Sequence, residues 1–101
     1  MRNIRGLIDC NETKEIPLGS VVFIYVYKGS EVIGHQTLQN IHKFPFEYKV
    51  DLNQVDLDSV SLRATIENGE KTLFLNGNGA ATLKDGETSD NLDIEVISYT
   101  G

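Results

Sequence analysis

The chain has 101 residues, of which 40% are hydrophobic and 24% are charged, so we expect residues 1–101 to form one globular domain. Its formal net charge of −6 would repel phosphate groups, which argues against nucleic acid and anionic membrane surfaces as partners. The single cysteine, Cys10, excludes an intramolecular disulfide and a cysteine-based zinc site.

No stretch of the chain approaches the roughly 20 consecutive apolar residues that a transmembrane helix needs, so no membrane span is predicted. The first residues, 1–5, lead directly into a strand-like pattern without the apolar region of a signal peptide. The given sequence therefore leaves the cellular location open.

The first half of the chain predicts three strands. Residues 2–10 form the first, with Ile4, Ile8 and Cys10 on one face. Residues 20–28 form the second, with every side chain from Val21 to Tyr27 β-branched or aromatic. Because that strand is apolar on both faces, it is either central in its sheet or covered on its second side. A turn at 28–30 leads to the third strand, residues 31–38.

The clearest alternation of apolar and polar residues lies in two segments, 44–51 and 59–67. The apolar members of these segments are Phe44, Phe46, Tyr48, Val50, Val60, Leu62, Ala64 and Ile66. Alternation with period two is typical of an antiparallel strand with one face on a core and one face in water. In the connection between the segments, Leu52, Val55 and Leu57 are expected to anchor the loop.

The remaining chain predicts further short strands. A type I′ turn at Asn68-Gly69 precedes a partner strand at 70–75. A break at 76–79 and a brief pairing at 82–83 lead to a last strand at 91–99, with Leu92, Ile94 and Val96 inward. About seven strands separated by turns every 8–12 residues predict an all-β, single-domain antiparallel β-sandwich, immunoglobulin-like or transthyretin-like in outline.

The search for chemistry predicts no catalytic residue, no metal ligand and no cofactor. Cys10 with His35 would be a nucleophile and a base, yet no local motif supports the pair, and His42 lies in a predicted loop. The loop from Asp51 to Asp58 resembles a calcium loop only loosely, because it lacks the glycine and one ligand of that motif. A small hydrolase or a calcium-binding enzyme is therefore the weakest alternative.

Two modification motifs are weak. Asn11 begins a glycosylation sequon, which matters only in a chain secreted by a eukaryotic cell. Leu7 to Cys10 has the spacing of a bacterial lipoprotein box, but Asp9 and the missing apolar stretch argue against lipidation of Cys10.

The second face of the 20–28 strand is the predicted partner-binding surface. Phe23, Tyr25 and Tyr27 would project from it in a row, and aromatic side chains are enriched at binding hot spots. The alternative is that a second sheet or a loop covers the row and makes it part of the core.

Three segments carry a resemblance to a known family. They are Ile16-Pro17-Leu18-Gly19-Ser20-Val21-Val22, Phe44-Pro45-Phe46-Glu47-Tyr48 and Leu62-Arg63-Ala64-Thr65-Ile66-Glu67-Asn68-Gly69. In their order and spacing the chain resembles the YbaY/YscW-like family of small bacterial lipoprotein domains, which includes the β-type pilotins, lipoprotein chaperones of type III secretion secretins. The resemblance implies a β-sandwich without catalytic residues, located in the periplasm or at the outer membrane. The signal peptide and lipidated cysteine common in that family are absent from the given sequence.

Three functions follow in order of preference. The first is a non-enzymatic binding or chaperone module that holds a peptide or protein of the cell envelope through a strand edge or its aromatic face. The second is a structural accessory domain of a longer protein. The third is the enzyme described above, and the oligomeric state is not predicted.

Overall fold

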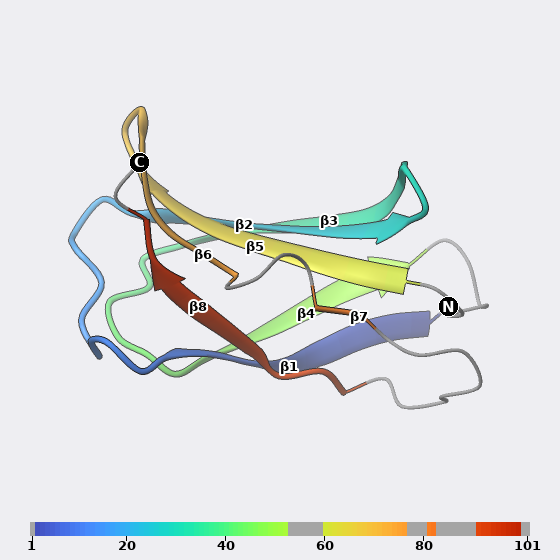
Figure 1. Ribbon diagram of the computed structural model, residues 1–101, viewed down its shortest axis with the longest axis horizontal. Helices are drawn as coiled ribbons and strands as arrows, with labels where there is room; N and C mark the ends of the chain where they lie inside the picture. The colour runs from blue at the N-terminus through green and yellow to red at the C-terminus, as the bar shows by residue number, and fades with distance from the viewer. Residues whose placement is uncertain (1, 53–59, 77–80, 83–90, 100–101) are drawn as a thin grey trace.

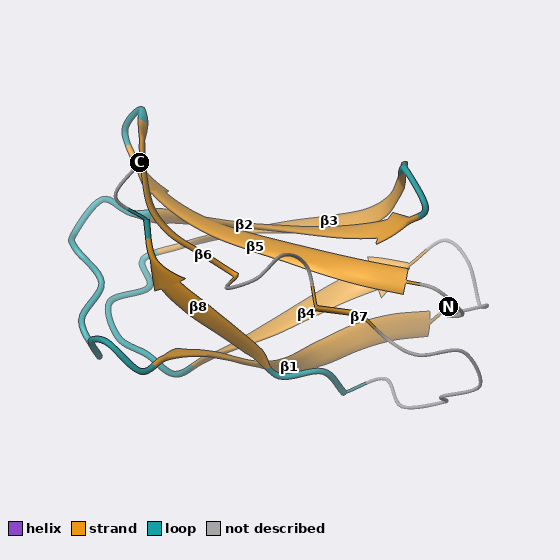
Figure 2. Cartoon of the chain, viewed as in Figure 1, coloured by secondary structure: helices purple, strands orange, loops and turns teal. Residues whose placement is uncertain are grey.

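The computed structural model describes residues 2–52, 60–76, 81–82 and 91–99, and all the regular structure in these residues is β-strand (Figure 2). No helix in the described part of the chain is long and apolar enough to cross a membrane. The strands are β1 (Arg2–Cys10), β2 (Val21–Lys28), β3 (Glu31–Gln39), β4 (Phe46–Leu52), β5 (Val60–Asn68), β6 (Lys71–Asn76), β7 (Ala81–Thr82) and β8 (Ile94–Ser98). The predicted all-β class is confirmed.

The strands form one mixed sheet in the order β3-β2-β5-β6-β8-β1-β4, and β7 adds to β5 (Figure 1). The sheet curls around its core until its two end strands meet, so that it is nearly barrel-shaped. Because the strands are connected in one sheet, the immunoglobulin-like or transthyretin-like sandwich is not confirmed.

The prediction of an antiparallel sheet is wrong at one ladder, because β1 and β8 run parallel. Ile8 pairs with Ile94 and Cys10 with Val96. Period-two alternation reports which face is buried and is the same for both pairing senses. A parallel pair needs a long connection, and here almost the whole chain lies between its two strands.

The end strands β3 and β4 meet without a backbone ladder between them. The side-chain oxygen Oε1 of Gln36 accepts a hydrogen bond from the amide of Lys49 at 2.9 Å. Nearby, a Cβ placed on Gly34 would lie only 2.9 Å from the carbonyl oxygen of Asp51, so the missing side chain lets the strands approach. The seam between the two edges is thus already occupied by contacts of this chain.

The core follows the predicted alternation. On β2, β4 and β5 every second side chain is buried, and on β1 the predicted inward residues are fully buried. The main buried residues are Ile4, Ile8, Cys10, Val22, Ile24, Val26, Phe44, Phe46, Tyr48, Val50, Leu52, Val60, Leu62, Ala64, Ile66, Phe74, Ile94 and Val96. The aromatic rings of Phe44, Phe46 and Phe74 pack together. The ring centroid of Phe46 lies 5.7 Å from that of Phe44, and the centroid of Phe74 lies 5.3 Å from it.

Both tight hairpins turn on a glycine at the first loop position. Gly29 and Gly69 each have a φ of 64°, a conformation that glycine adopts without a steric penalty. The predicted Asn68-Gly69 turn is therefore wrong by one residue, because Asn68 still pairs with Lys71 and the loop is Gly69 with Glu70. The side-chain Nδ2 of Asn68 donates a hydrogen bond to the carbonyl oxygen of Leu18 at 2.8 Å.

Several predicted strand ends differ from the observed ones. β4 begins at Phe46 and not at Phe44, since Pro45 has no amide hydrogen to give to a ladder. β8 begins at Ile94, although Asn91 already forms an isolated parallel bridge with Arg5. Val55, Leu57 and Leu83 lie outside the described residues.

Candidate functional site

The predicted aromatic row lies on the outer face of a strand that is central in the sheet. β2 pairs with β3 on one side and with β5 on the other. Val22, Ile24 and Val26 point into the core, whereas Phe23, Tyr25 and Tyr27 point away from it and are half-buried. The row is therefore not part of the core formed by the described residues, and neighbouring rings only partly shield it.

The rings contact one another along and across the strands. The ring centroids of Tyr25 and Tyr27 lie 6.4 Å apart. The imidazole of His35, on β3, stacks beside Tyr25 with the same centroid separation and an interplanar angle of 28°. These separations fall within the range of favourable aromatic pairs, so the row holds a defined shape.

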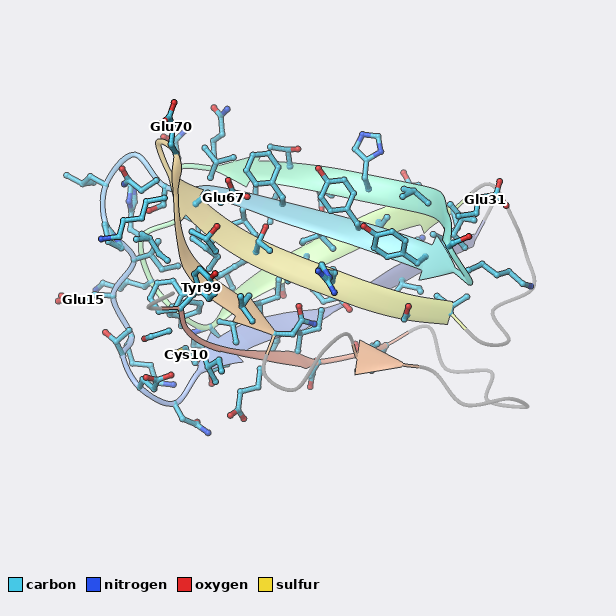
Figure 3. The ribbon with its side chains drawn as sticks, turned by 45° about the horizontal axis from the view of Figure 1, so that its top comes forward. Cys10, Glu15, Glu31, Glu67, Glu70 and Tyr99 are labelled. Atoms are coloured by element: carbon cyan, nitrogen blue, oxygen red, sulfur yellow. The ribbon has the colours of Figure 1, made fainter. Side chains whose placement is uncertain are left out.

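The sheet register extends this row beyond β2. Phe23 pairs with Thr65 of β5, Thr65 with Leu75 of β6, and Leu75 with Ile97 of β8. Because paired residues point to the same face, the apolar side chains of β2, β6 and β8 share one outer surface, with the polar residue Thr65 of β5 between Phe23 and Leu75. We call the residues Phe23, Tyr25, Tyr27, Leu75 and Ile97 the aromatic face. Figure 3 views the strands of this face, with Glu31 at one end of the sheet and Glu67 and Glu70 at the other.

Sequence reasoning found three members of the aromatic face and missed Leu75 and Ile97. Ile97 is 40% exposed and Leu75 is half-buried, so both contribute accessible apolar surface. Their sequence signal was an apolar residue out of phase with buried neighbours, Phe74 and Val96. This pattern can be interpreted only once the strand register is known, because the register places Leu75 beside Ile97.

A break in the sheet lies under the middle of the aromatic face. The β5–β6 ladder reaches only to Thr65, and the β5–β7 ladder begins only at Leu62. The buried side chain of Asn76 fills the gap: its Oδ1 accepts from the amide of Ala64 at 2.6 Å, and its Nδ2 donates to the carbonyl oxygen of Leu62 at 3.1 Å. Asn76 thus gives β5 the hydrogen bonds that a neighbouring strand would supply.

Arg63 projects outward from β5 at this break. It is exposed, it pairs across the strands with Tyr25, and it lines a hollow of about 110 Å³ together with Thr65, Leu75 and Asn76. Both neighbours of Arg63 on the outer face of β5, Ser61 and Thr65, are uncharged. Among the described residues, one cation, Arg63, therefore lies between the rings of β2 and Leu75 of β6.

The outer surface of β1 and β4 has a different character. Paired across these strands are Arg5 with Lys49 and Leu7 with Glu47, all exposed. We call Arg5, Leu7, Glu47 and Lys49 the charged face. A broad depression of about 550 Å³ lies over it and has Gln36 and Asn91 at its borders. Its described lining combines both signs of charge with the side chain of Leu7 and the ring of Tyr48.

The backbone of β1 packs closely against the backbone of Leu92 at Gly6. A Cβ at this position would overlap the carbonyl oxygen of Leu92, which accepts a hydrogen bond from the hydroxyl of Tyr48. Tyr48 stands opposite Gly6 in the β1–β4 ladder. Burial of the Tyr48 ring raises the pKa of its hydroxyl, and the negative charge of Asp93 raises it further. Tyr48 is therefore a buried structural donor.

The residues considered for nucleophilic catalysis are not brought together. Cys10 is fully buried on the inner face of β1, whereas His35 is exposed on the outer face of β3. His42 is exposed in the connection before β4, and its carbonyl oxygen accepts a hydrogen bond from the amide of Ile16 at 2.9 Å. The geometry thus gives the thiol no histidine base.

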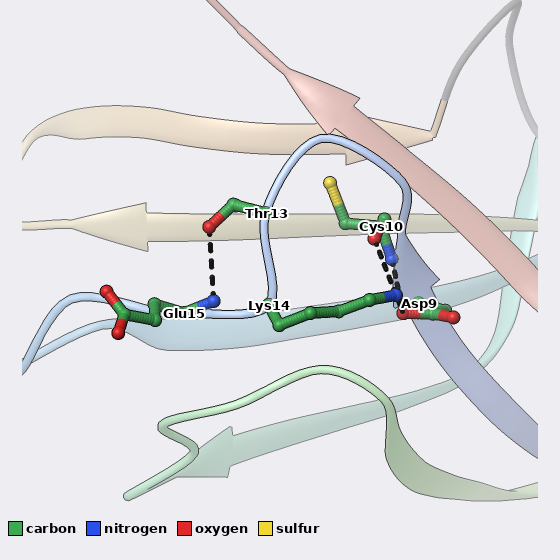
Figure 4. Close-up of polar contacts among 5 residues, drawn as sticks. All are labelled: Asp9, Cys10, Thr13, Lys14 and Glu15. Carbon is green, nitrogen blue, oxygen red and sulfur yellow. Dashed lines mark hydrogen bonds and ion pairs between the residues drawn. The ribbon is translucent and has the colours of Figure 1, made fainter.

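The segment after Cys10 is held by local polar contacts (Figure 4). The ammonium of Lys14 donates to Asp9 Oδ1 at 2.8 Å and to the carbonyl oxygen of Cys10 at 3.0 Å. The bond from Lys14, followed by the bond from the backbone amide of Cys10, lowers the pKa of Asp9. Asn11, the start of the predicted sequon, is exposed in this segment.

Within the described ranges, no three His, Cys, Asp or Glu side chains come together as a possible metal site. Of the acidic loop considered for calcium, Asp51 is exposed at the end of β4. Asp56 and Asp58 lie outside the described residues.

No family model matches the chain, and no curated protein matches it. Among solved structures, the chain is similar to an alternative pilotin from the type II secretion system of Vibrio cholerae, with a TM-score of 0.81 and 21% sequence identity. The similarity covers 99% of this chain and 98% of that chain. At this identity the likeness establishes a common pilotin-like, all-β fold.

Proposed function

We propose that the chain is a non-enzymatic, pilotin-like binding protein of the bacterial cell envelope, which holds a segment of a larger secretion-system protein. The observation that carries the proposal is the aromatic face, a group of partly exposed apolar side chains from β2, β6 and β8 on one outer surface of a chain of net charge −6. Partly exposed apolar side chains gathered on one face are typical of an interaction site.

Two further lines support this proposal. The similar solved structure is that of a pilotin from a type II secretion system, and the structural similarity spans nearly all of both chains. The three segments that resemble the YbaY/YscW-like family point independently to lipoprotein domains that include pilotins. In the structure the Phe-Pro-Phe motif leads into β4, which begins at Phe46, and the Arg-Ala-x-Ile-Glu motif lies within β5, so both belong to the scaffold. An outer-membrane or periplasmic location is part of the proposal.

We place the contact on the aromatic face and not at a strand edge. β2 has both of its edges paired, so Phe23, Tyr25 and Tyr27 are reached only through their side chains. The end strands β3 and β4 lie against each other and are bridged by Gln36. The addition of a strand from a partner would first have to separate them.

The test is an array of overlapping peptides that covers the secretin and the other secretion-system proteins of the source organism. The dissociation constant of the strongest peptide is then measured with three forms of the chain: wild type, Tyr25→Ala on the aromatic face, and Lys49→Ala on the charged face. We expect Tyr25→Ala to weaken binding about tenfold or more, the effect of removing a hot-spot aromatic residue. Lys49→Ala should leave the constant unchanged.

Two outcomes would overturn the proposal. One is that no peptide of the array binds the folded wild-type chain. The other is that Lys49→Ala abolishes binding while Tyr25→Ala does not affect it. Melting temperatures of the variants, measured on the same samples, confirm that each is folded.

A further inference from the structure

In the part of the chain that the structure describes, the charged side chain of Arg63 lies between the β2 and β6 members of the aromatic face, and its surroundings indicate what it binds. Arg63 points outward from β5 beside Tyr25, and Phe23 and Tyr27 flank Tyr25 along β2. Within the described part of the chain, no carboxylate forms an ion pair with Arg63. Glu67 lies four residues further along β5, roughly 13 Å away at about 3.3 Å per residue, and receives a bond from Thr65 at 3.4 Å.

The contrast with the other cations of the sheet makes this arrangement informative. On the charged face, Lys49 has two carboxylates beside it on its own strand, Glu47 and Asp51, and stands opposite Arg5 of β1. Arg63 lies between Ser61 and Thr65, and its cross-strand neighbour is a tyrosine. An acidic chain that keeps an unbalanced guanidinium among rings is complementary to a partner with an anionic group between apolar ones.

The sheet also leaves room for such a group. Because β6 ends its pairing at Thr65 and β7 begins at Leu62, no strand among the described residues pairs with β5 at Arg63, beside the hollow. The hollow of about 110 Å³ equals the volume of three to four water molecules in the liquid, at about 30 Å³ each. Thr65 and Asn76 add polar atoms to its lining. A carboxylate fits this space, and a guanidinium can bind a carboxylate through two parallel hydrogen bonds.

We propose that the partner segment of the aromatic face has a carboxylate between apolar side chains, and that Arg63 binds this carboxylate at the β5–β6 break. The carboxylate is either an aspartate or glutamate side chain or the C-terminus of the partner. This inference rests on the proposed function, because it specifies the chemistry of the segment that the aromatic face holds. Arg63 is then a specificity-determining residue, and the rings supply the apolar contact.

The test uses a library of eight-residue synthetic peptides, prepared once with free carboxyl termini and once with amidated termini. We expect the wild-type chain to select aromatic or aliphatic residues around an acidic group. Enrichment of Asp or Glu in both forms would identify a side-chain carboxylate, and binding of the free-acid form alone would identify a C-terminus. Arg63→Glu should shift the selection from acidic toward basic residues, because the partner charge is reversed.

A selected peptide then serves as the probe for affinity. Arg63→Gln, which keeps hydrogen-bond donors but removes the charge, should raise its dissociation constant roughly tenfold or more. The wild-type constant should rise with added salt more steeply than that of Arg63→Gln. The matched control for Arg63→Glu is Lys49→Glu, the same reversal of charge on the charged face, which should leave the selection of peptides unaltered.

The outcomes separate this inference from the proposed function. Peptides that depend on Tyr25 but show no acidic preference, with Arg63→Glu selecting the same sequences, would overturn the role of Arg63 and leave the binding face intact. Failure to select any peptide that depends on Tyr25 would overturn the proposed function itself.

Discussion

The aromatic face and the charged face are outer surfaces of the same curled sheet, and they differ in almost every respect except the core beneath them. Under both, the inward side chains are Ile, Val, Leu and large aromatic residues. On the outside, β1 and β4 present Arg5, Glu47 and Lys49, whereas β2 presents Phe23, Tyr25 and Tyr27. The core packing requires no particular outer side chains.

This difference supports the proposal that the aromatic face, and not the charged face, takes part in binding. The charged face combines the charged side chains Arg5, Glu47 and Lys49 with one exposed apolar side chain, Leu7. The aromatic face exposes rings whose transfer to a partner surface would be favourable. We therefore expect substitutions in the core beneath both faces to lower stability, and substitutions on the aromatic face to weaken binding.

The largest expected effect concerns the scaffold under the charged face. Gly6→Ala would force Cβ into the carbonyl oxygen of Leu92 and disturb the bond from Tyr48. We expect the free energy of unfolding, measured with urea, to fall by about 3 kcal/mol, at the upper end of overpacking effects. The control is Gly29→Ala, where a Cβ would have open space around it. Only the backbone φ of 64° disfavours alanine there, so we expect the free energy of unfolding to fall by about 1–2 kcal/mol. An effect of Gly6→Ala no larger than that of the control would contradict the close packing at Gly6.

Beneath the aromatic face the corresponding point is Asn76. Asn76→Ala would leave the amide of Ala64 and the carbonyl of Leu62 without partners inside the protein. We expect a loss of about 2 kcal/mol in the free energy of unfolding, the penalty for buried polar groups without hydrogen bonds. Thr37→Ala, an exposed substitution on β3, should change the same quantity by less than about 0.5 kcal/mol. Equal effects of the two variants would show that the break at β5 needs no bridge.

Tyr48 allows a test by pH. Its pKa is raised by burial, so the folded state favours the neutral phenol. This contribution to stability is fully present below the unfolded pKa of about 10 and is lost as the pH rises above it. We expect Tyr48→Phe to lower the free energy of unfolding at pH 7 by about 1 kcal/mol through the lost bond to Leu92, and to flatten the decline above pH 10. Tyr99→Phe, at an exposed position, is the control; an identical alkaline decline in wild type and Tyr48→Phe would refute the assignment.

The smallest effect is expected at the exposed pair of Asp9 and Lys14. Because Lys14 lowers the pKa of Asp9, the pair stabilises the fold above the unfolded pKa of about 4, and this contribution is lost as the pH falls through the lower folded value. Lys14→Met should move the pKa of Asp9 back toward its ordinary value, as followed by NMR titration of its carboxyl carbon. Thr13→Ala, which keeps Lys14, should leave that titration unchanged, and a pKa unaffected by Lys14→Met would exclude the ion pair as its cause.

Local alternation was enough to predict which side chains form the core. Ile4, Val22, Tyr48 and Ile66 were all expected inward, and all are buried. The sense of the β1–β8 pairing was beyond such reasoning, because it joins residues 86 positions apart whose pattern is the same in either direction.

The candidate site was predictable only in part, for the same reason. Phe23, Tyr25 and Tyr27 lie on one strand and are visible in its period. Leu75 and Ile97 join them only through three successive registers. Asn76, expected in a turn, is instead buried, since its role depends on the distance between two ladders on β5.

The central claim is that the aromatic face, and not the charged face, holds the partner segment. The most direct measurement is a series of ¹H–¹⁵N NMR spectra of the chain titrated with the strongest peptide of the secretion-protein array. The account predicts shifts of the amides of Phe23, Tyr25, Leu75 and Ile97, with those of Leu7, Glu47 and Lys49 unmoved. Shifts confined to β1 and β4, with the amides of the aromatic face unchanged, would contradict it.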